Sequence, residues 1–144
     1  MTDVHDKKTR SFNMSQIKGK NTKPEILVRT FLHQHGFRFR LHVKNLPGKP
    51  DIVLPKYKTV IFVHGCFWHG HHNCKYYVVP KTQTLYWSEK IKGNSQRDKN
   101  NFLRIRKAGW KVITIFECKL RRRLRESTLK KLKEQLKLQS RNEQ

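Results

Sequence analysis

All three cysteines of the chain fit a single metal site. Cys66 and Cys74 bound a nine-residue stretch that also carries three histidines, and Cys118 follows far along the sequence. Thiolates and imidazoles are the ligands that zinc prefers, and a structural zinc ion takes four of them in a tetrahedron. We expect His71 to be the fourth ligand, with His72 as the alternative, so that Cys118 ties this loop to the core. The competing interpretation is buried free thiols beside a surface cluster of histidines.

The odd cysteine count and the charge balance narrow the class of protein. Three thiols cannot all pair within one chain, which argues against a disulfide framework. The 144 residues carry 33 Lys and Arg against 10 Asp and Glu, and the formal net charge of +23 is best tolerated beside a polyanion. No apolar run approaches the ~20 residues of a membrane span, and the amino terminus has no apolar signal core. We therefore expect a cytoplasmic protein that binds nucleic acid.

Hydrophobic periodicity predicts helices that flank a sheet. Thr22, Pro24 and Glu25 form a capping pattern for a first helix, and strict alternation over residues 37–43 is typical of a half-buried strand. The expected helices span residues 22–35, 83–91, 95–108 and about 127–139, and the expected strands span 37–43, 51–54, 59–63 and 110–117. This order favours an α/β fold with a mixed central sheet. We expect residues 1–21 to be a flexible arm and residues 22–144 to be one domain.

An aspartate and a histidine are expected at neighbouring strand ends. Asp51 begins one short strand and His64 ends the next, so the two lie side by side. A carboxylate placed there can hold Mg²⁺ against a phosphate, and His64 or His69 can act as a base or hold metal-bound water. Glu25 suits both the cap of its helix and the outer shell of a magnesium site. The alternative for Asp51 is a hydrogen bond to its own backbone in a Pro-Gly turn.

The loop and the turn before it carry a specific resemblance. The run Val63-His64-Gly65-Cys66-Phe67-Trp68-His69-Gly70-His71, preceded by Leu46-Pro47-Gly48-Lys49-Pro50-Asp51, closely resembles the very-short-patch mismatch repair endonucleases of bacteria. Further matching motifs lie within residues 3–14, 80–98 and 109–118, so the resemblance covers nearly the whole chain to about residue 125.

The resemblance implies a strand-specific DNA endonuclease with a restriction-endonuclease-like core. Members of the family cut on the 5′ side of the thymine in a T:G mismatch, typically where 5-methylcytosine has deaminated. By this resemblance, Asp51 and the backbone carbonyl of Val63 correspond to Mg²⁺ ligands. His69 corresponds to the base that activates water, and His64 and Glu25 correspond to residues that hold metal-bound water. The glutamate-x-lysine pair of the wider superfamily is absent, so histidine chemistry would replace the lysine.

The same resemblance implies a zinc site. Its ligands correspond to Cys66, His71, Cys74 and Cys118. Two residues separate His71 from Cys74 where some members of the family have one, which leaves His72 open as the histidine ligand.

Recognition of DNA is expected from aromatic and amide side chains. By resemblance, Phe67 and Trp68 enter the base stack beside the mismatch from the major groove, Met14 enters from the other side, and Lys90 and Asn94 touch the mismatched bases. For adjacent aromatics the alternative is packing in the core. The resemblance also implies a monomer on DNA and a MutL-type mismatch-repair protein as partner.

Two other classes of protein compete with the endonuclease. One is a zinc-containing protein that binds mismatched DNA without cutting it, and the other is a general RNA-binding protein. Asp51 and His69 favour the enzyme, because binding alone needs no carboxylate beside the phosphate.

Overall fold

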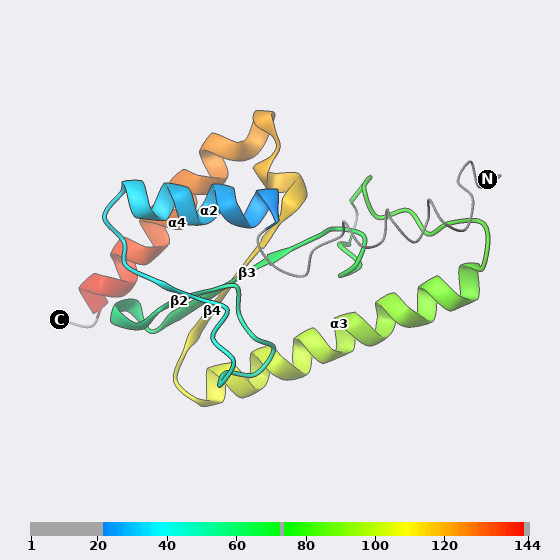
Figure 1. The fold of residues 1–144 in the computed structure, drawn as a ribbon, viewed down its shortest axis with the longest axis horizontal. Helices are drawn as coiled ribbons and strands as arrows, with labels where there is room; N and C mark the ends of the chain where they lie inside the picture. The colour runs from blue at the N-terminus through cyan, green and yellow to red at the C-terminus, as the bar shows by residue number, and fades with distance from the viewer. Residues whose placement is uncertain (1–21, 73, 143–144) are drawn as a thin grey trace.

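A mixed four-stranded sheet forms the centre of the molecule (Figure 1). The computed structural model describes residues 22–72 and 74–142. The strands in this part of the chain are β1 (Arg40–Leu41), β2 (Ile52–Leu54), β3 (Thr59–His64) and β4 (Lys111–Phe116). They lie in the order β1-β2-β3-β4, antiparallel from β1 to β3 and parallel between β3 and β4. The predicted mixed α/β sheet is confirmed, with the strand that is apolar on both faces at an inner position.

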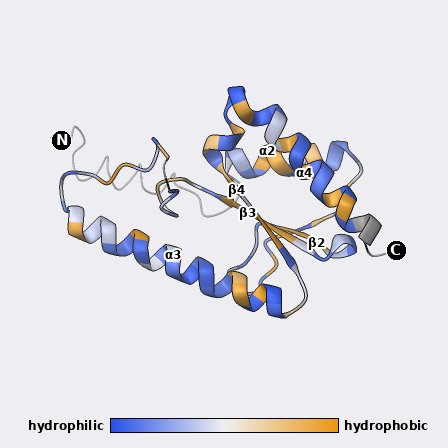
Figure 2. Cartoon of the chain, turned by 180° about the vertical axis from the view of Figure 1, so that it is seen from behind, coloured by the Kyte–Doolittle hydropathy of each residue, from blue (hydrophilic) through white to orange (hydrophobic). Residues whose placement is uncertain are grey.

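Three helices in the described part of the chain cover the two faces of this sheet. α2 (Lys23–Gln34) and α4 (Arg122–Asn142) lie on one face, and α3 (Thr84–Lys107) crosses the other (Figure 1). Strand side chains alternate between two cores, since Ile52 packs with α2 and α4 whereas Val53 packs with α3. Figure 2 shows the apolar strands between these layers. None of the described helices has the length and apolarity needed to cross a membrane.

The start of α2 brings Glu25 into the interior. Thr22 is the N-cap, and its hydroxyl oxygen accepts a hydrogen bond of 3.4 Å from the backbone N–H of Glu25, while Pro24 lies in the first turn. Gly36 follows the helix at φ +82°, a left-handed conformation that glycine adopts without steric cost. The predicted cap is confirmed. It places Glu25 on the core side of the helix, where the residue is only 1% exposed.

The segment expected to form two helices forms one. A break was expected between residues 91 and 95, but α3 runs unbroken through Gly93. A glycine inside a helix costs ~1 kcal/mol relative to alanine. Ile91 and Ile105 are buried on either side of it, and this tertiary packing outweighs the local cost.

Two other boundaries also differ from the expected ones. β1 covers only two of the residues expected at 37–43, because its partner β2 has three residues with which to pair. α4 begins at residue 122 rather than near 127. Its first turn is closed by the backbone N–H groups of Leu124 and Arg125, each 2.9 Å from the carbonyl of Arg121. That arginine-rich turn has little apolar periodicity, so the sequence did not reveal it.

One edge of the sheet collects the ends of three strands. β3 and β4 are parallel with His64 opposite Phe116, so the loop after β3 and the short 3-10 helix after β4 (Glu117–Leu120) begin side by side. β2 starts at the same edge because it is antiparallel to β3. Residues far apart in the sequence therefore meet here.

Candidate active site and metal centre

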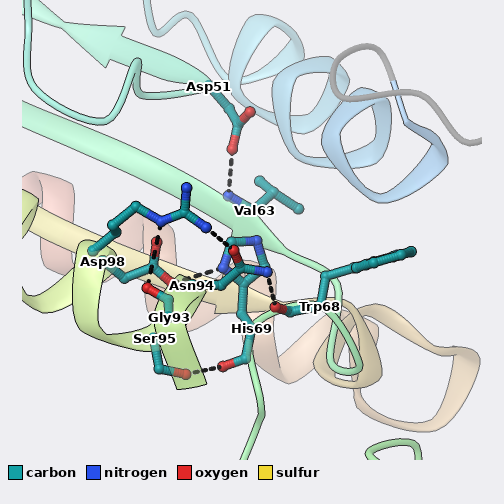
Figure 3. A network of polar contacts seen from close by, with 9 residues as sticks. Asp51, Val63, Trp68, His69, Gly93, Asn94, Ser95 and Asp98 are labelled. Carbon is teal, nitrogen blue, oxygen red and sulfur yellow. Dashed lines mark hydrogen bonds and ion pairs between the residues drawn. The ribbon is translucent and has the colours of Figure 1, made fainter. Parts of the chain in front are cut away.

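Asp51 lies just before β2, beside the end of β3. Its Oδ2 accepts a hydrogen bond of 2.7 Å from the backbone N–H of Val63 (Figure 3). The N–H and C=O groups of one strand residue point toward the same neighbouring strand, so the carbonyl of Val63 faces the same side as the Asp51 carboxylate. The expectation that Asp51 and His64 lie at adjacent strand ends is confirmed.

Two further side chains reach Asp51 from the elements around it. Glu25 comes from α2, and its Oε2 lies 3.0 Å from Nη1 of Arg29 and 3.3 Å from Nε2 of His42, the residue after β1. Glu25, His42 and Asp51 each offer a ligand atom, and these atoms lie within 4.8 Å of one another. A divalent cation is a partner that two such carboxylates can share.

The ionisation of Asp51 reflects this setting. Burial, with a smaller contribution from nearby Glu25, raises the pKa of the Asp51 carboxyl group from 3.8 to about 7, although the hydrogen bond from Val63 acts to lower it. Two carboxylates in a buried site repel each other when both are charged. A dication bound between them would remove this repulsion and displace the proton, so the donor set fits a divalent metal ion.

Two histidines and an aspartate form a second group at the same edge. The rings of His64 and His69 stack with centroids 3.6 Å apart and planes 3° apart. Nδ1 of His69 lies 2.7 Å from Oδ2 of Asp98 on α3, and the hydroxyl of Ser95 donates to the carbonyl of His69 at 3.2 Å (Figure 3). Burial, helped by the charge of His69, lowers the pKa of His64 to about 4. His64 is therefore neutral at neutral pH.

Four side chains around the loop after β3 form a separate ligand group. Cys66, His71, Cys74 and Cys118 offer ligand atoms within 4.8 Å of one another. Sγ of Cys118 lies 3.4 Å from Nδ1 of His71, close to the ~3.5 Å edge between nitrogen and sulfur on a tetrahedral zinc ion. The residues fit zinc. The structure brings His71 into this group, whereas His72 is exposed and outside it.

Burial shifts the pKa values of three of these four ligands in the absence of a cation. It raises the pKa of the Cys66 thiol to about 12 and also raises that of Cys118. It lowers the pKa of His71, which keeps the imidazole in the neutral form that binds metals. The ring of His71 stacks on Phe116 at 3.8 Å, and Oε1 of Glu117 accepts from the backbone N–H of Cys66 at 3.2 Å. The end of β4 thus positions both ligands.

Phe67 and Trp68 belong to an aromatic group outside both cores. They pack with Trp87 of α3, with ring centroids between 5.2 and 5.8 Å apart in edge-on arrangements. Nζ of Lys90 lies 5.9 Å from the ring centroid of Trp68 and 6.0 Å from that of Trp87. All three rings are half-buried. Partly exposed rings beside a cation suit contact with nucleic-acid bases.

Asn94 holds the aromatic loop against α3. Its Nδ2 donates to the carbonyl of Trp68 at 2.9 Å, and its Oδ1 accepts from Arg97 (Figure 3). Lys90 and Asn94 lie on one continuous helix, one turn apart as expected. Contact between these two side chains and DNA bases stays a prediction. Met14 and the rest of the expected arm at 1–21 lie outside the described residues.

Sequence reasoning missed His42 and Asp98. Asp98 follows Lys90 and Asn94 at intervals of four, which is one face of a helix, but the expected break near Gly93 obscured that spacing. His42 is one of several basic residues that alternate with apolar ones in the segment 37–43. No signal in the sequence separates it from its neighbours.

The fold and this edge of the sheet together define an α/β nuclease. The family model described as DNA mismatch endonuclease Vsr matches residues 2–75 of the chain. The chain belongs to the Vsr family of DNA mismatch endonucleases.

Three relatives match over most of their length. The chain is 52% identical to the Type II nicking enzyme V.NmeAIP of Neisseria meningitidis serogroup A, over 84% of this chain and 86% of that protein. It is 48% identical to the Type II nicking enzyme V.XorIIP of Xanthomonas oryzae pv. oryzae, over 83% and 88% respectively. It is 46% identical to the DNA mismatch endonuclease Vsr of Escherichia coli K12, over 85% and 78% respectively.

Proposed function

We propose that this protein nicks one strand of duplex DNA on the 5′ side of the thymine in a T:G mismatch, by Mg²⁺-dependent hydrolysis of the phosphodiester bond. The names of its relatives, a mismatch endonuclease and two nicking enzymes, support the substrate and the single cut. The observation that carries the proposal is the pairing of His69 with Asp98 close to the half-buried carboxylate of Asp51. A protein that only binds mismatches has no use for this arrangement.

Asp51 and the carbonyl of Val63 are the proposed Mg²⁺ ligands. Bound Mg²⁺ would supply a positive charge that stabilises the developing charge on the phosphate and lowers the pKa of a water molecule. The hydrogen bond from Val63 orients the Asp51 carboxylate. Glu25 and His64 are the proposed holders of water molecules around the ion. His64 does so as a neutral ring, because burial lowers its pKa to about 4.

His69 is the proposed general base. With its Nδ1–H donating to Asp98, Nε2 carries the lone pair that can accept a proton from water. The negative charge of Asp98 stabilises the imidazolium that forms. His64, stacked on His69, stays neutral and so does not oppose this charge.

The zinc ion is proposed to be structural. A zinc ion held by four protein ligands, Cys66, His71, Cys74 and Cys118, has no open position for a substrate. Zinc would join the loop that carries His69 to the end of β4.

DNA recognition is proposed to use the aromatic group. Phe67 and Trp68 would enter the stack beside the mismatch, where unstacking costs least. Met14 is proposed to enter from the opposite side, and Lys90 and Asn94 to contact the mismatched bases. We propose that the protein acts as a monomer and cooperates with a MutL-type repair protein.

The test is a nicking assay on two duplexes that differ only in a T:G pair within a CC(A/T)GG-type site. We expect a Mg²⁺-dependent nick on the 5′ side of the mismatched thymine and none in the matched duplex. Tight binding of mismatched DNA without a cut, in this and other sequence contexts, would instead identify a non-cleaving mismatch-binding protein.

A further inference from the structure

We propose that His42 binds the active-site cation directly through Nε2, so that the centre offers nitrogen as well as oxygen and favours first-row transition-metal dications over Mg²⁺. This inference rests on the proposed function, because it concerns the same site. It adds a ligand that neither the sequence motif nor the family resemblance indicates.

The backbone brings His42 to Asp51. Leu41 pairs with Ile52 in the register of β1 and β2, so the next residues along, His42 and Asp51, face each other. The backbone N–H of His42 donates to the carbonyl of Asp51 at 3.3 Å. His42 adopts φ +51°, a left-handed conformation that is uncommon for residues other than glycine and that turns its chain away from the strand path.

The imidazole points a buried nitrogen at the two carboxylates. Nε2 of His42 is inaccessible to solvent and makes no hydrogen bond among the described residues, although it lies 3.3 Å from Oε2 of Glu25. Buried polar nitrogens are almost always hydrogen-bonded, so one without such a bond calls for an explanation. Arg29 already gives Glu25 a positive partner at 3.0 Å. A lone pair on Nε2 directed at a shared cation accounts for both observations.

The distances suit one ion. The ligand atoms of Glu25, His42 and Asp51 lie within 4.8 Å of one another, and ligands at ~2.1 Å on opposite sides of a cation are ~4.2 Å apart. A small side-chain rotation would bring Nε2 of His42 and the Asp51 carboxylate onto one centre, with Glu25 close enough to hold a water molecule on the ion. Within residues 22–72 and 74–142, the charged and titratable groups facing it are Glu25, Arg29, Asp51 and His69.

A nitrogen ligand changes which ion the site prefers. Mg²⁺ is a hard cation that takes oxygen ligands, whereas imidazole stabilises Mn²⁺, Co²⁺ and Ni²⁺ increasingly along the first-row series. The chain would therefore bind Mn²⁺ more tightly than Mg²⁺, and His42 would account for much of the difference.

The test uses Mn²⁺ as a spectroscopic probe on the full-length, zinc-loaded protein without DNA. The thiolate-rich zinc site disfavours Mn²⁺, so the added ion reports the site at Asp51. Pulsed electron paramagnetic resonance detects a directly bound imidazole as ¹⁴N hyperfine coupling. We expect this coupling in the wild type and in His33→Gln, an exposed histidine on α2, and its loss in His42→Gln. The Mn²⁺ affinity of His42→Gln should fall about tenfold, and its Mg²⁺ affinity much less.

The outcomes separate this inference from the proposed function. Absence of ¹⁴N coupling in the wild type, or its persistence in His42→Gln, overturns the inference, whatever the nicking assay gives. If His42→Gln does not fold, His42→Asp supplies an oxygen ligand in its place, and it should bind Mn²⁺ without ¹⁴N coupling. Nitrogen coupling in a protein that never nicks T:G duplexes would support the metal ligand and refute the proposed function.

Discussion

His69 and Asp98 meet across 29 residues of sequence, with Nδ1 of the imidazole 2.7 Å from Oδ2 of the carboxylate. The contact joins the loop after β3 to the middle of α3. A carboxylate in this position fixes which ring nitrogen carries the proton. In the proposed mechanism, Nε2 of His69 therefore accepts the proton from water, and Nδ1 orients the ring.

Asp98→Asn should lower the nicking rate about 100-fold while leaving affinity for T:G duplexes unchanged. The amide can donate to Nδ1, which would place the ring proton on Nε2 and remove the lone pair that accepts from water. Single-turnover rates across pH check this, because a positioning residue that sets the tautomer alters the pH profile as well as the maximum. Glu89→Gln, an exposed carboxylate change on the same helix, is the control, and an equal loss there would contradict the role of Asp98.

Asp51→Asn should abolish nicking, keep mismatch binding and stabilise the protein at neutral pH in the absence of Mg²⁺. The folded pKa of about 7 lies above the unfolded value of 3.8, so ionisation of Asp51 disfavours the folded state as pH rises between these values. Melting temperatures of zinc-loaded protein without Mg²⁺ provide the measurement. Above pH 7 the variant should melt at least ~2 °C higher than the wild type, and the gap should close near pH 4. A variant that melts at a lower temperature than the wild type at pH 8 would show that the ionised Asp51 carboxylate does not destabilise the folded state.

His64→Gln should remove a loss of stability that the wild type suffers in acid. The folded pKa of about 4 lies below the unfolded value of 6.5, so the unfolded chain takes up the proton first and stability falls as pH drops from 6.5 to 4. Urea denaturation at pH 7 and 4.5 should show a wild-type loss from this group of ~2 kcal/mol that is missing in the variant. His33→Gln should behave as the wild type, and a similar effect there would indicate a general response to charge.

Cys118→Ser should release zinc and lower the melting temperature by at least ~10 °C, because structural zinc is coupled to folding. Metal analysis after gel filtration and thermal melting together measure the effect. A chelator should bring the wild type down to the same melting temperature. Full zinc content with wild-type melting in the variant would refute the site. His72→Ala serves as the matched control, since His72 lies outside the ligand group.

Phe67→Ala should reduce the preference for T:G over T:A duplexes about tenfold, because one aromatic stack on a base contributes ~1–3 kcal/mol. Competition binding on the two duplexes measures the ratio directly. Leu103→Ala, an exposed apolar change on the opposite half of α3, should leave it intact. An unchanged ratio in Phe67→Ala would assign the ring to packing against Trp87.

Much of this site could be predicted because its residues are close in sequence or lie at strand ends. A cysteine count of three, with two thiols in a histidine-rich loop, indicated one ligand set, and the structure brings Cys118 to it through the parallel pairing of β3 and β4. Asp51 and His64 were expected as neighbours because short successive strands pair. The pairing of β2 with β3 followed from the same argument.

The rest depended on tertiary contacts that leave no local pattern. His42 becomes relevant only when β1 stops after two residues and the chain turns at positive φ. Asp98 becomes relevant only when α3 continues through Gly93. The low helix propensity of glycine disfavours a continuous helix there, whereas the packing of Ile91 and Ile105 stabilises it. Residue type and spacing do not single out His42, and the four-residue spacing between Asn94 and Asp98 is informative only if the helix is known to be continuous.

The continuity of α3 fixes the angle about the helix axis between the side chains proposed to contact bases and the carboxylate that holds His69, the proposed general base. Lys90, Asn94 and Asp98 follow one another at intervals of four along the 24 unbroken residues of α3, so their side chains lie on one face of the helix. The Lys90 ammonium group lies beside the aromatic rings, the Asn94 amide holds the loop, and Asp98 contacts His69. One inserted residue between Asn94 and Asp98 would rotate the second half of that face by about 100°. Such an insertion would leave both halves of the helix folded and both groups of side chains present, yet no longer in register.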